Sequence, residues 1–67
     1  MATVHDLAVV IVERRRALGI TQEDLAFTVG VNRRVIGELE RGKESVRADI
    51  LLRTLEALGL DVRIEAR

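Results

Sequence analysis

Residues 15–43 read RRALGITQEDLAFTVGVNRRVIGELERGK, and this stretch predicts two short helices joined by a tight turn. Thr21 is a good helix N-cap, and Asp24, three residues later, has the spacing of a capping box. Gly30 ends the first of these helices, because a left-handed conformation costs glycine little. Asn32 then supplies the N-cap of the second helix. The stretch therefore encodes a helix, a turn and another helix.

The helical pattern continues on both sides of this stretch and changes only at the end of the chain. Apolar residues recur at spacings of three and four, as a buried helix face requires. In the first helix this stripe comprises Leu7, Val10, Ile11, Arg14 or Arg15, and Leu18. The expected elements are helices over about 5–18, 21–29, 32–40 and 47–58 and a strand over about 60–65. Ser45 offers the best capping chemistry before the fourth helix. One all-α domain, residues 1–67, is predicted.

The composition excludes several classes of site. Among 67 residues there is no Cys, so disulfides and Cys-based metal sites are excluded, and His5 alone cannot hold a metal. No cofactor is expected, and the scarcity of nucleophiles speaks against an enzyme. The longest apolar run, Leu7–Val12, is too short to span a bilayer. No export signal is evident, so a cytoplasmic location is expected.

Charge gives a mixed signal about nucleic acid. Eleven basic and eleven acidic residues cancel, whereas a basic excess is usual in proteins that bind nucleic acid. The distribution matters more than the sum, because a neutral chain can still present a basic surface. Five basic residues fall close together in the sequence: Arg33, Arg34, Arg41, Lys43 and Arg47.

The end of the chain predicts a strand that lacks a partner. Leu60, Val62 and Ile64 alternate with charged residues, which is the pattern of a strand with one apolar face. A strand needs a neighbour for its backbone groups, and no second convincing strand occurs. The economical partner is the same strand of a second copy, which would also cover Val9 and Val12. A homodimer is expected; the alternative is a frayed tail.

Several positions carry a family resemblance: Arg15, Leu18-Gly19, Thr21-Gln22, Leu25-Ala26, Gly30-Val31, Ile36, Leu39-Glu40 and Gly42-Lys43. This pattern resembles the helix-turn-helix of the lambdoid phage repressor and Cro superfamily, the Xre-like regulators, over residues 7–59. The ending ERGKESVRADILLRTLEALGL, followed by the short strand, is similar to one branch of that family. That branch contains the HipB-like antitoxins, whose C-terminal strands pair across a dimer. The resemblance thus implies a four-helix lambda-repressor-like fold.

The resemblance also implies roles by position. The residues that would face base edges in the major groove of DNA are Asn32, Arg33, Arg34 and Glu38. The residues that would contact phosphates are Gln22, Arg41, Lys43 and Arg47. Arg33 and Arg34 are roughly 100° apart on the helix, so one is expected on a base and the other shared with phosphate. Glu38 could accept from cytosine N4 or hold Arg34 by an i,i+4 contact.

Other charged and aromatic residues have structural interpretations. By family position, Arg15 pairs with Glu40 in a partly buried bridge between the first and third helices. Arg14 and Arg16 are expected in solvent. Phe27 lies on the outer side of its helix, where it could belong to the rim of the core or touch a partner protein.

The leading interpretation is a homodimeric repressor that binds a palindromic operator in double-stranded DNA. The resemblance further suggests an antitoxin that represses its own operon and neutralises a HipA-like toxin kinase. Two alternatives remain open. One is a stand-alone or phage-type regulator without a toxin. The other is a protein-interaction module whose helix-turn-helix no longer reads DNA.

Overall fold

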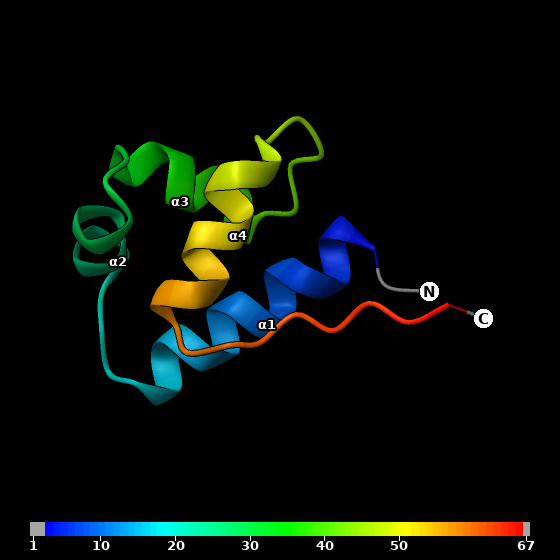
Figure 1. The fold of residues 1–67 in the computed structure, drawn as a ribbon. Coiled ribbons are helices and arrows are strands. Elements are labelled where there is room, and N and C mark those ends of the chain that lie inside the picture. The colour runs from blue at the N-terminus through cyan, green and yellow to red at the C-terminus, as the bar shows by residue number, and fades with distance from the viewer. Residues whose placement is uncertain (1–2, 67) are drawn as a thin grey trace.

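The computed structural model describes residues 3–66, which form four α-helices (Figure 1). The helices are α1 (Val4–Ala17), α2 (Gln22–Val29), α3 (Arg33–Glu40) and α4 (Ala48–Ala57). α2 packs against both α3 and α4, and α1 packs against α3. The expectation of a small all-helical fold with four helices is confirmed. No helix in the described part of the chain is long and apolar enough to cross a membrane.

The core is aliphatic and draws on every helix. Ile11 of α1, Leu25 of α2, Ile36 of α3 and Leu58, directly after α4, are at most 1% exposed. The other buried apolar residues are Ala8, Ala26, Val29, Leu39 and Leu55. Burying one large aliphatic side chain contributes about 1.5–3 kcal/mol. This shared core fixes α2 and α3 relative to their two supporting helices.

The inward face of α1 differs from the predicted stripe. Ala8 and Ile11 are buried, whereas Val10 and Leu18 are 42% and 45% exposed, so the prediction was wrong for those two residues. The physical reason is that Arg15, four residues after Ile11, shares the inward face and makes an ion pair with α3. Val10 lies roughly 140° around the helix from Arg15 and so points away from the inward face, whereas Leu18 is the C-cap residue, beyond the last helical residue Ala17.

α4 begins without a side-chain cap. Its N-cap residue is Arg47, whose side chain makes no capping hydrogen bond. Ser45, expected to supply this bond, lies in the preceding loop and is exposed. That expectation was wrong because a cap must directly precede the first helical residue, here Ala48.

The chain continues past α4 as an extended tail, residues 60–66. The Leu60 N–H donates to the Leu55 carbonyl at 2.9 Å, and the Leu60 side chain packs against the core. Beyond it, Val62 and Ile64 are 51% and 92% exposed. In Figure 1 this tail, drawn orange to red, runs toward the same side of the molecule as the start of α1. Residues 3–66 contain no strand, because a single chain offers this tail no ladder partner.

Candidate nucleic-acid interface

A capping box fixes the start of α2. The Thr21 hydroxyl accepts from the Asp24 N–H at 3.0 Å, and the Thr21 N–H donates to the Asp24 carboxylate at 2.9 Å. Hydrogen bonds from the Thr21 backbone and side chain lower the pKa of the Asp24 carboxyl. Both residues therefore hold the first turn of α2, which begins at Gln22, in one orientation.

Hydrogen bonds at the end of α2 and at the start of α3 fix the turn between these two helices. Gly30 has a φ of +84°, and its N–H donates to the Ala26 carbonyl at 2.8 Å. The Asn32 side chain accepts from the Arg34 N–H at 2.8 Å and so caps α3. These are the local features that the sequence predicted for a helix, a turn and a second helix.

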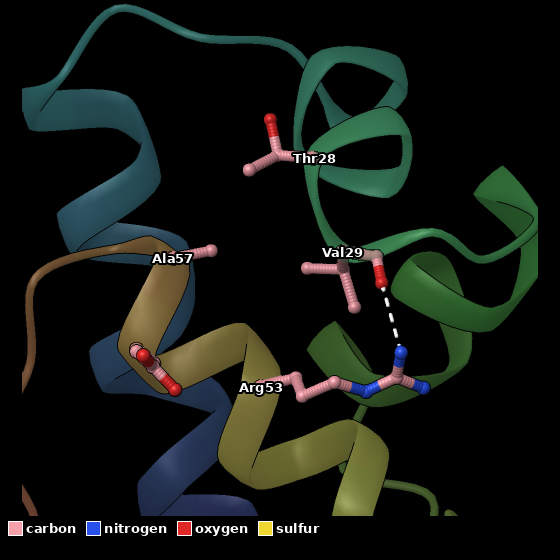
Figure 2. A pocket seen from close by; sticks show the side chains of 5 residues that line it. Thr28, Val29, Arg53 and Ala57 are labelled. Carbon is pink, nitrogen blue, oxygen red and sulfur yellow. Dashed lines mark hydrogen bonds between the residues drawn. The ribbon is translucent and has the colours of Figure 1, made fainter.

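A contact from α4 reinforces the same turn. Arg53 Nη1 donates to the Val29 carbonyl at 3.2 Å, at the last residue of α2 (Figure 2). A cation here also opposes the negative end of the α2 dipole. The sequence does not predict this contact, because Arg53 and Val29 belong to different helices and no local pattern joins them. The angle between α2 and α3 is therefore held by α4 as well as by the turn itself.

α3 has one buried apolar face, and its N-terminal turn exposes polar side chains. Ile36, Gly37 and Leu39 are buried, and α3 is strongly amphipathic as a result. On the other side, Arg33 and Arg34 are exposed in the first turn of the helix. Asn32 is exposed directly before them. These three of the four predicted base-contacting residues thus lie together at the N-terminal end of α3.

Glu38, the fourth predicted base-contacting residue, is held by two cations. Its Oε2 lies 3.0 Å from Lys43 Nζ, and its Oε1 lies 3.7 Å from Arg34 Nε. The side chain of Glu38 is only 23% exposed, although it lies on the outer part of α3. The hydrogen bond from Lys43, aided by the charges of Arg34 and Arg41, holds the pKa of the Glu38 carboxyl below its usual value. Glu38 therefore remains ionised between these neighbours at neutral pH.

The four predicted phosphate-contacting residues differ in their surroundings. The exposed Lys43 pairs with Glu38, and Arg47 pairs with Asp49 at 2.9 Å. Arg41 follows α3, and its guanidinium lies over the buried Gly37, where a Cβ would approach Arg41 Nη1 to 3.2 Å. The Gln22 amide is already engaged, because its Nε2 donates to Glu40 Oε1 at 3.0 Å. Three basic residues are thus placed after α3, while Gln22 points into the support between helices.

An ion pair joins α1 to the end of α3. Arg15 Nε donates to Glu40 Oε2 at 2.7 Å, and Arg15 Nη2 donates to Glu40 Oε1 at 3.1 Å. The same guanidinium donates to the Ile20 carbonyl at 2.9 Å. The side chains of Arg15 and Glu40 are 13% and 6% exposed. This two-pronged bond fixes α3 against α1 and ties in Gln22 through the shared carboxylate.

The two charges of this pair stabilise each other. Burial alone would raise the pKa of the Glu40 carboxyl, but hydrogen bonds from Arg15 and Gln22 and the charge of Arg15 outweigh it, and the pKa lies below its usual value. The hydrogen bond to Glu40 likewise raises the pKa of Arg15. The carboxylate and the guanidinium both stay charged at neutral pH.

Two residues outside the motif have surroundings that the sequence left open or incomplete. Arg14 is exposed, as expected, but its Nε also donates to the Leu58 carbonyl at 2.9 Å, at the end of α4. The partner lies far away in the sequence, which is why no local pattern revealed it. Phe27 is 90% exposed, so it does not belong to the rim of the core.

The residues predicted for a dimer interface are divided between α1 and the tail. Val9 is 44% exposed and Val12 is half-buried. Leu60 is half-buried against the core of its own chain, whereas Val62 and Ile64 are exposed. The end of α4 lies beside α1, where Arg14 Nε donates to the Leu58 carbonyl.

Comparison with known proteins agrees with this architecture. A helix-turn-helix family matches residues 11–64, which include α2, α3 and α4. An uncharacterized HTH-type transcriptional regulator of Methanothermobacter thermautotrophicus is 47% identical over 47 residues, which make up 70% of this chain and 68% of that protein. The chain therefore belongs to the helix-turn-helix family of the Xre and lambda-repressor type.

Proposed function

We propose that this chain is a DNA-binding transcriptional regulator in which α3 enters the major groove. The observation that carries the proposal is the end of α3, where Asn32, Arg33 and Arg34 are exposed while the opposite face of the helix is buried. In helix-turn-helix proteins the N-terminal residues of the second helix contact base edges. The name of the similar archaeal protein supports a role in transcription. The proposed role is binding, without catalysis.

The residues divide into base-reading and backbone-binding groups. Arginine is the commonest reader of guanine, through two bonds to O6 and N7 worth about 1–3 kcal/mol of discrimination. Adjacent helix positions differ by roughly 100°, so one of Arg33 and Arg34 reads a base and the other shares a phosphate. Asn32 and Glu38 complete the base-reading group. The backbone-binding group comprises Arg41, Lys43 and Arg47, together with the backbone N–H of Gln22 at the start of α2, since the Gln22 amide is bound to Glu40.

The protein acts as a homodimer in this proposal, with the tails of two copies paired as antiparallel strands. Val62 and Ile64 expose apolar side chains that a second copy would cover, together with Val9 and Val12 of α1. A two-fold axis would direct two α3 helices toward half-sites about one helical turn apart. The corresponding ligand is a palindromic operator.

The DNA-binding proposal is tested by selecting duplexes from a random pool and measuring affinity by fluorescence anisotropy. Arg33→Ala or Arg34→Ala should relax preference at one base pair per half-site, whereas Lys43→Ala should weaken all sequences alike. Arg63→Ala, in the tail, is the matched control and should change neither. With three cationic phosphate contacts per subunit, the log–log salt slope should be near −5. Failure of the wild-type chain to bind any duplex at low salt would contradict the proposal and favour a protein-interaction module.

The dimer is tested by ending the chain after Leu60. This truncation keeps Leu60, which packs on the core, and removes residues 61–65 of the predicted strand. Sedimentation equilibrium should give a dimer for the full chain and a monomer for the truncated one. Unchanged helix content, measured by circular dichroism, would show that the truncated chain still folds. A truncated chain that remained dimeric would contradict the paired tails.

An antitoxin role is the finer part of the proposal. It rests on the resemblance of the chain from Glu40 onward to HipB-like antitoxins and on the exposed Phe27, which is available to a partner protein. The partner would be a HipA-like toxin kinase, and the antitoxin would also repress its own operon. Co-expression with a kinase encoded beside this gene should give a complex that co-elutes in gel filtration. Separate elution would support a stand-alone or phage-type regulator instead.

A further inference from the structure

Glu38 places a negative charge inside the basic face of α3. Its two carboxylate oxygens contact different cations: Oε2 lies 3.0 Å from Lys43 Nζ and Oε1 lies 3.7 Å from Arg34 Nε. Lys43 belongs to the loop after α3 and Arg34 to the first turn of the helix. Glu38 therefore bridges a predicted base-contacting arginine and a predicted phosphate-contacting lysine.

This arrangement opposes binding to DNA of arbitrary sequence. Binding of that kind is driven mainly by cations that neutralise phosphates and release counterions. Lys43 and Arg34 must share their charge with Glu38 or leave it before they can neutralise phosphates. The Glu38 carboxylate also repels the phosphates themselves, and its 23% exposure shows that it is held at the helix and not extended into solvent.

Every base pair presents an exocyclic amino group in the major groove on only one of its two bases, so only one orientation of a pair can offset this effect. In the major groove, cytosine N4 and adenine N6 present hydrogen-bond donors, whereas guanine O6 and N7 and thymine O4 present acceptors. A carboxylate can accept from an exocyclic amino group but has no hydrogen to donate to an acceptor. A carboxylate brought against guanine or thymine would lose its hydration without gaining a hydrogen bond.

We propose that Glu38 is a specificity-determining residue that weakens binding to all duplexes except those that place an exocyclic amino group opposite it. Its ion pairs with Arg34 and Lys43 hold it at the groove-facing side and moderate the basic surface of the free protein. The inference rests on the proposed DNA-binding function and adds to it a negative contribution to nonspecific affinity.

The test compares Glu38→Gln with Glu56→Gln. Both remove one negative charge and keep the side-chain shape, but Glu56 is exposed in the C-terminal half of α4, where it lines an open pocket between α2 and α4 (Figure 2). Affinity is measured by fluorescence anisotropy for a mixed-sequence duplex at low salt. Glu38→Gln should bind about fivefold to tenfold tighter than wild type, and Glu56→Gln within about twofold of it. The gain should shrink as salt concentration rises.

A selection experiment tests the base preference directly. From a random duplex pool, the wild-type chain should enrich cytosine or adenine at one position per half-site. Glu38→Gln should lose this preference, because a glutamine amide both donates and accepts. Enrichment of guanine or thymine opposite residue 38 would overturn the inference.

The outcomes separate this inference from the function on which it rests. If wild type binds duplexes but Glu38→Gln and Glu56→Gln bind alike, the inference is wrong while the DNA-binding function stands. If wild type binds no duplex, both are wrong. Thermal unfolding of each variant guards against loss of fold. Should Glu38→Gln unfold, Lys43→Met breaks the shorter ion pair from the other side, and its own selected operator must keep cytosine or adenine opposite Glu38.

Discussion

The segment from Thr21 to Lys43 and the tail 60–66 differ in whether the same chain caps their backbone groups and buries their apolar side chains. In the first segment, side chains of the same chain cap both helices, and Ile36 is fully buried. In the tail, Ile64 is 92% exposed, and residues 61–66 make no backbone hydrogen bond to the rest of the described chain. One region is complete within a single chain. The other has apolar side chains that only a contact with another molecule could bury.

The same contrast holds for their ion pairs. Glu40 of the first segment meets Arg15 of α1 through two hydrogen bonds, with the side chains of Arg15 and Glu40 13% and 6% exposed. In the tail, Arg63 and Glu65 meet at 3.4 Å with side chains 83% and 74% exposed. Solvent screening leaves an exposed pair worth little, whereas loss of one partner of a buried pair strands a charge. An Arg–Glu pair therefore matters for stability where it is buried, between α1 and α3, and contributes little where it is exposed, in the tail.

The largest expected effect comes from breaking the buried pair. Arg15→Ala should lower the free energy of unfolding by about 3–5 kcal/mol, because Glu40 is left buried without its guanidinium. A domain of this size has little stability to spare, so most of the cooperative transition should be lost. Urea unfolding followed by circular dichroism measures it. Arg63→Ala is the matched control, with an expected change below about 1 kcal/mol. Equal losses of unfolding free energy in Arg15→Ala and Arg63→Ala would contradict the difference proposed between the buried and the exposed ion pair.

The second-largest effect should come from protonation of Glu40 in the Arg15–Glu40 pair at low pH, which should lower the stability of the fold. The pKa of Glu40 is lowered in the folded chain from an ordinary value of 4.5, so the unfolded chain takes up the proton more readily. This contribution to stability is present above pH 4.5 and is lost as the pH falls toward the folded pKa. Thermal unfolding between pH 7 and pH 3 should show a shallower loss for Glu40→Gln than for wild type. Glu65→Gln, in the tail, should follow the wild-type profile, and a profile for Glu40→Gln as steep as wild type would contradict this assignment.

The turn between α2 and α3 should be more sensitive than a glycine within a helix. Gly30→Ala should cost about 1–2 kcal/mol, because φ is +84° there. A Cβ at Gly30 would meet nothing within 4 Å, so the cost is conformational and not steric. Gly37→Ala is the control: its φ is not positive, and the nearby atom is the flexible end of Arg41. A larger loss for Gly37→Ala than for Gly30→Ala in urea unfolding would reverse this order.

The sequence predicted the features whose partners lie within a few residues. The Thr21–Asp24 capping box and the Asn32 cap are formed by neighbours in the chain, so their residue types and spacing are sufficient to identify them. The Arg15–Glu40 contact spans a longer interval and was expected only through the family resemblance. Local spacing therefore identified the helix-turn-helix itself but not what holds it.

The features that the sequence analysis missed depend on how helices cross. Arg14 reaches Leu58 and Arg53 reaches Val29 only because α1 and α2 pack beside α4. Periodicity likewise gives a helix an apolar side without fixing its rotation, so it left Arg14 and Arg15 as alternatives for the inward position of α1 and placed Val10 on a face where it is in fact exposed. The tail adds a further limit, because alternation in a sequence does not show which chain supplies the partner.

The smallest effect on the stability of a single chain should come from a substitution in the tail. The same substitution should have a large effect on dimer affinity. Ile64→Ser should change the stability of the monomer by less than about 0.5 kcal/mol, because the side chain is already 92% exposed. If paired tails bury Ile64 in both copies, each loses about 1.5–3 kcal/mol, and the dimer dissociation constant should rise by roughly 100-fold or more. Arg63→Ser, on the polar face of the same tail, should leave that constant nearly unchanged. Sedimentation equilibrium over a range of concentrations distinguishes the two, and an intact dimer for Ile64→Ser would mean that the apolar face of the tail is not the contact between copies.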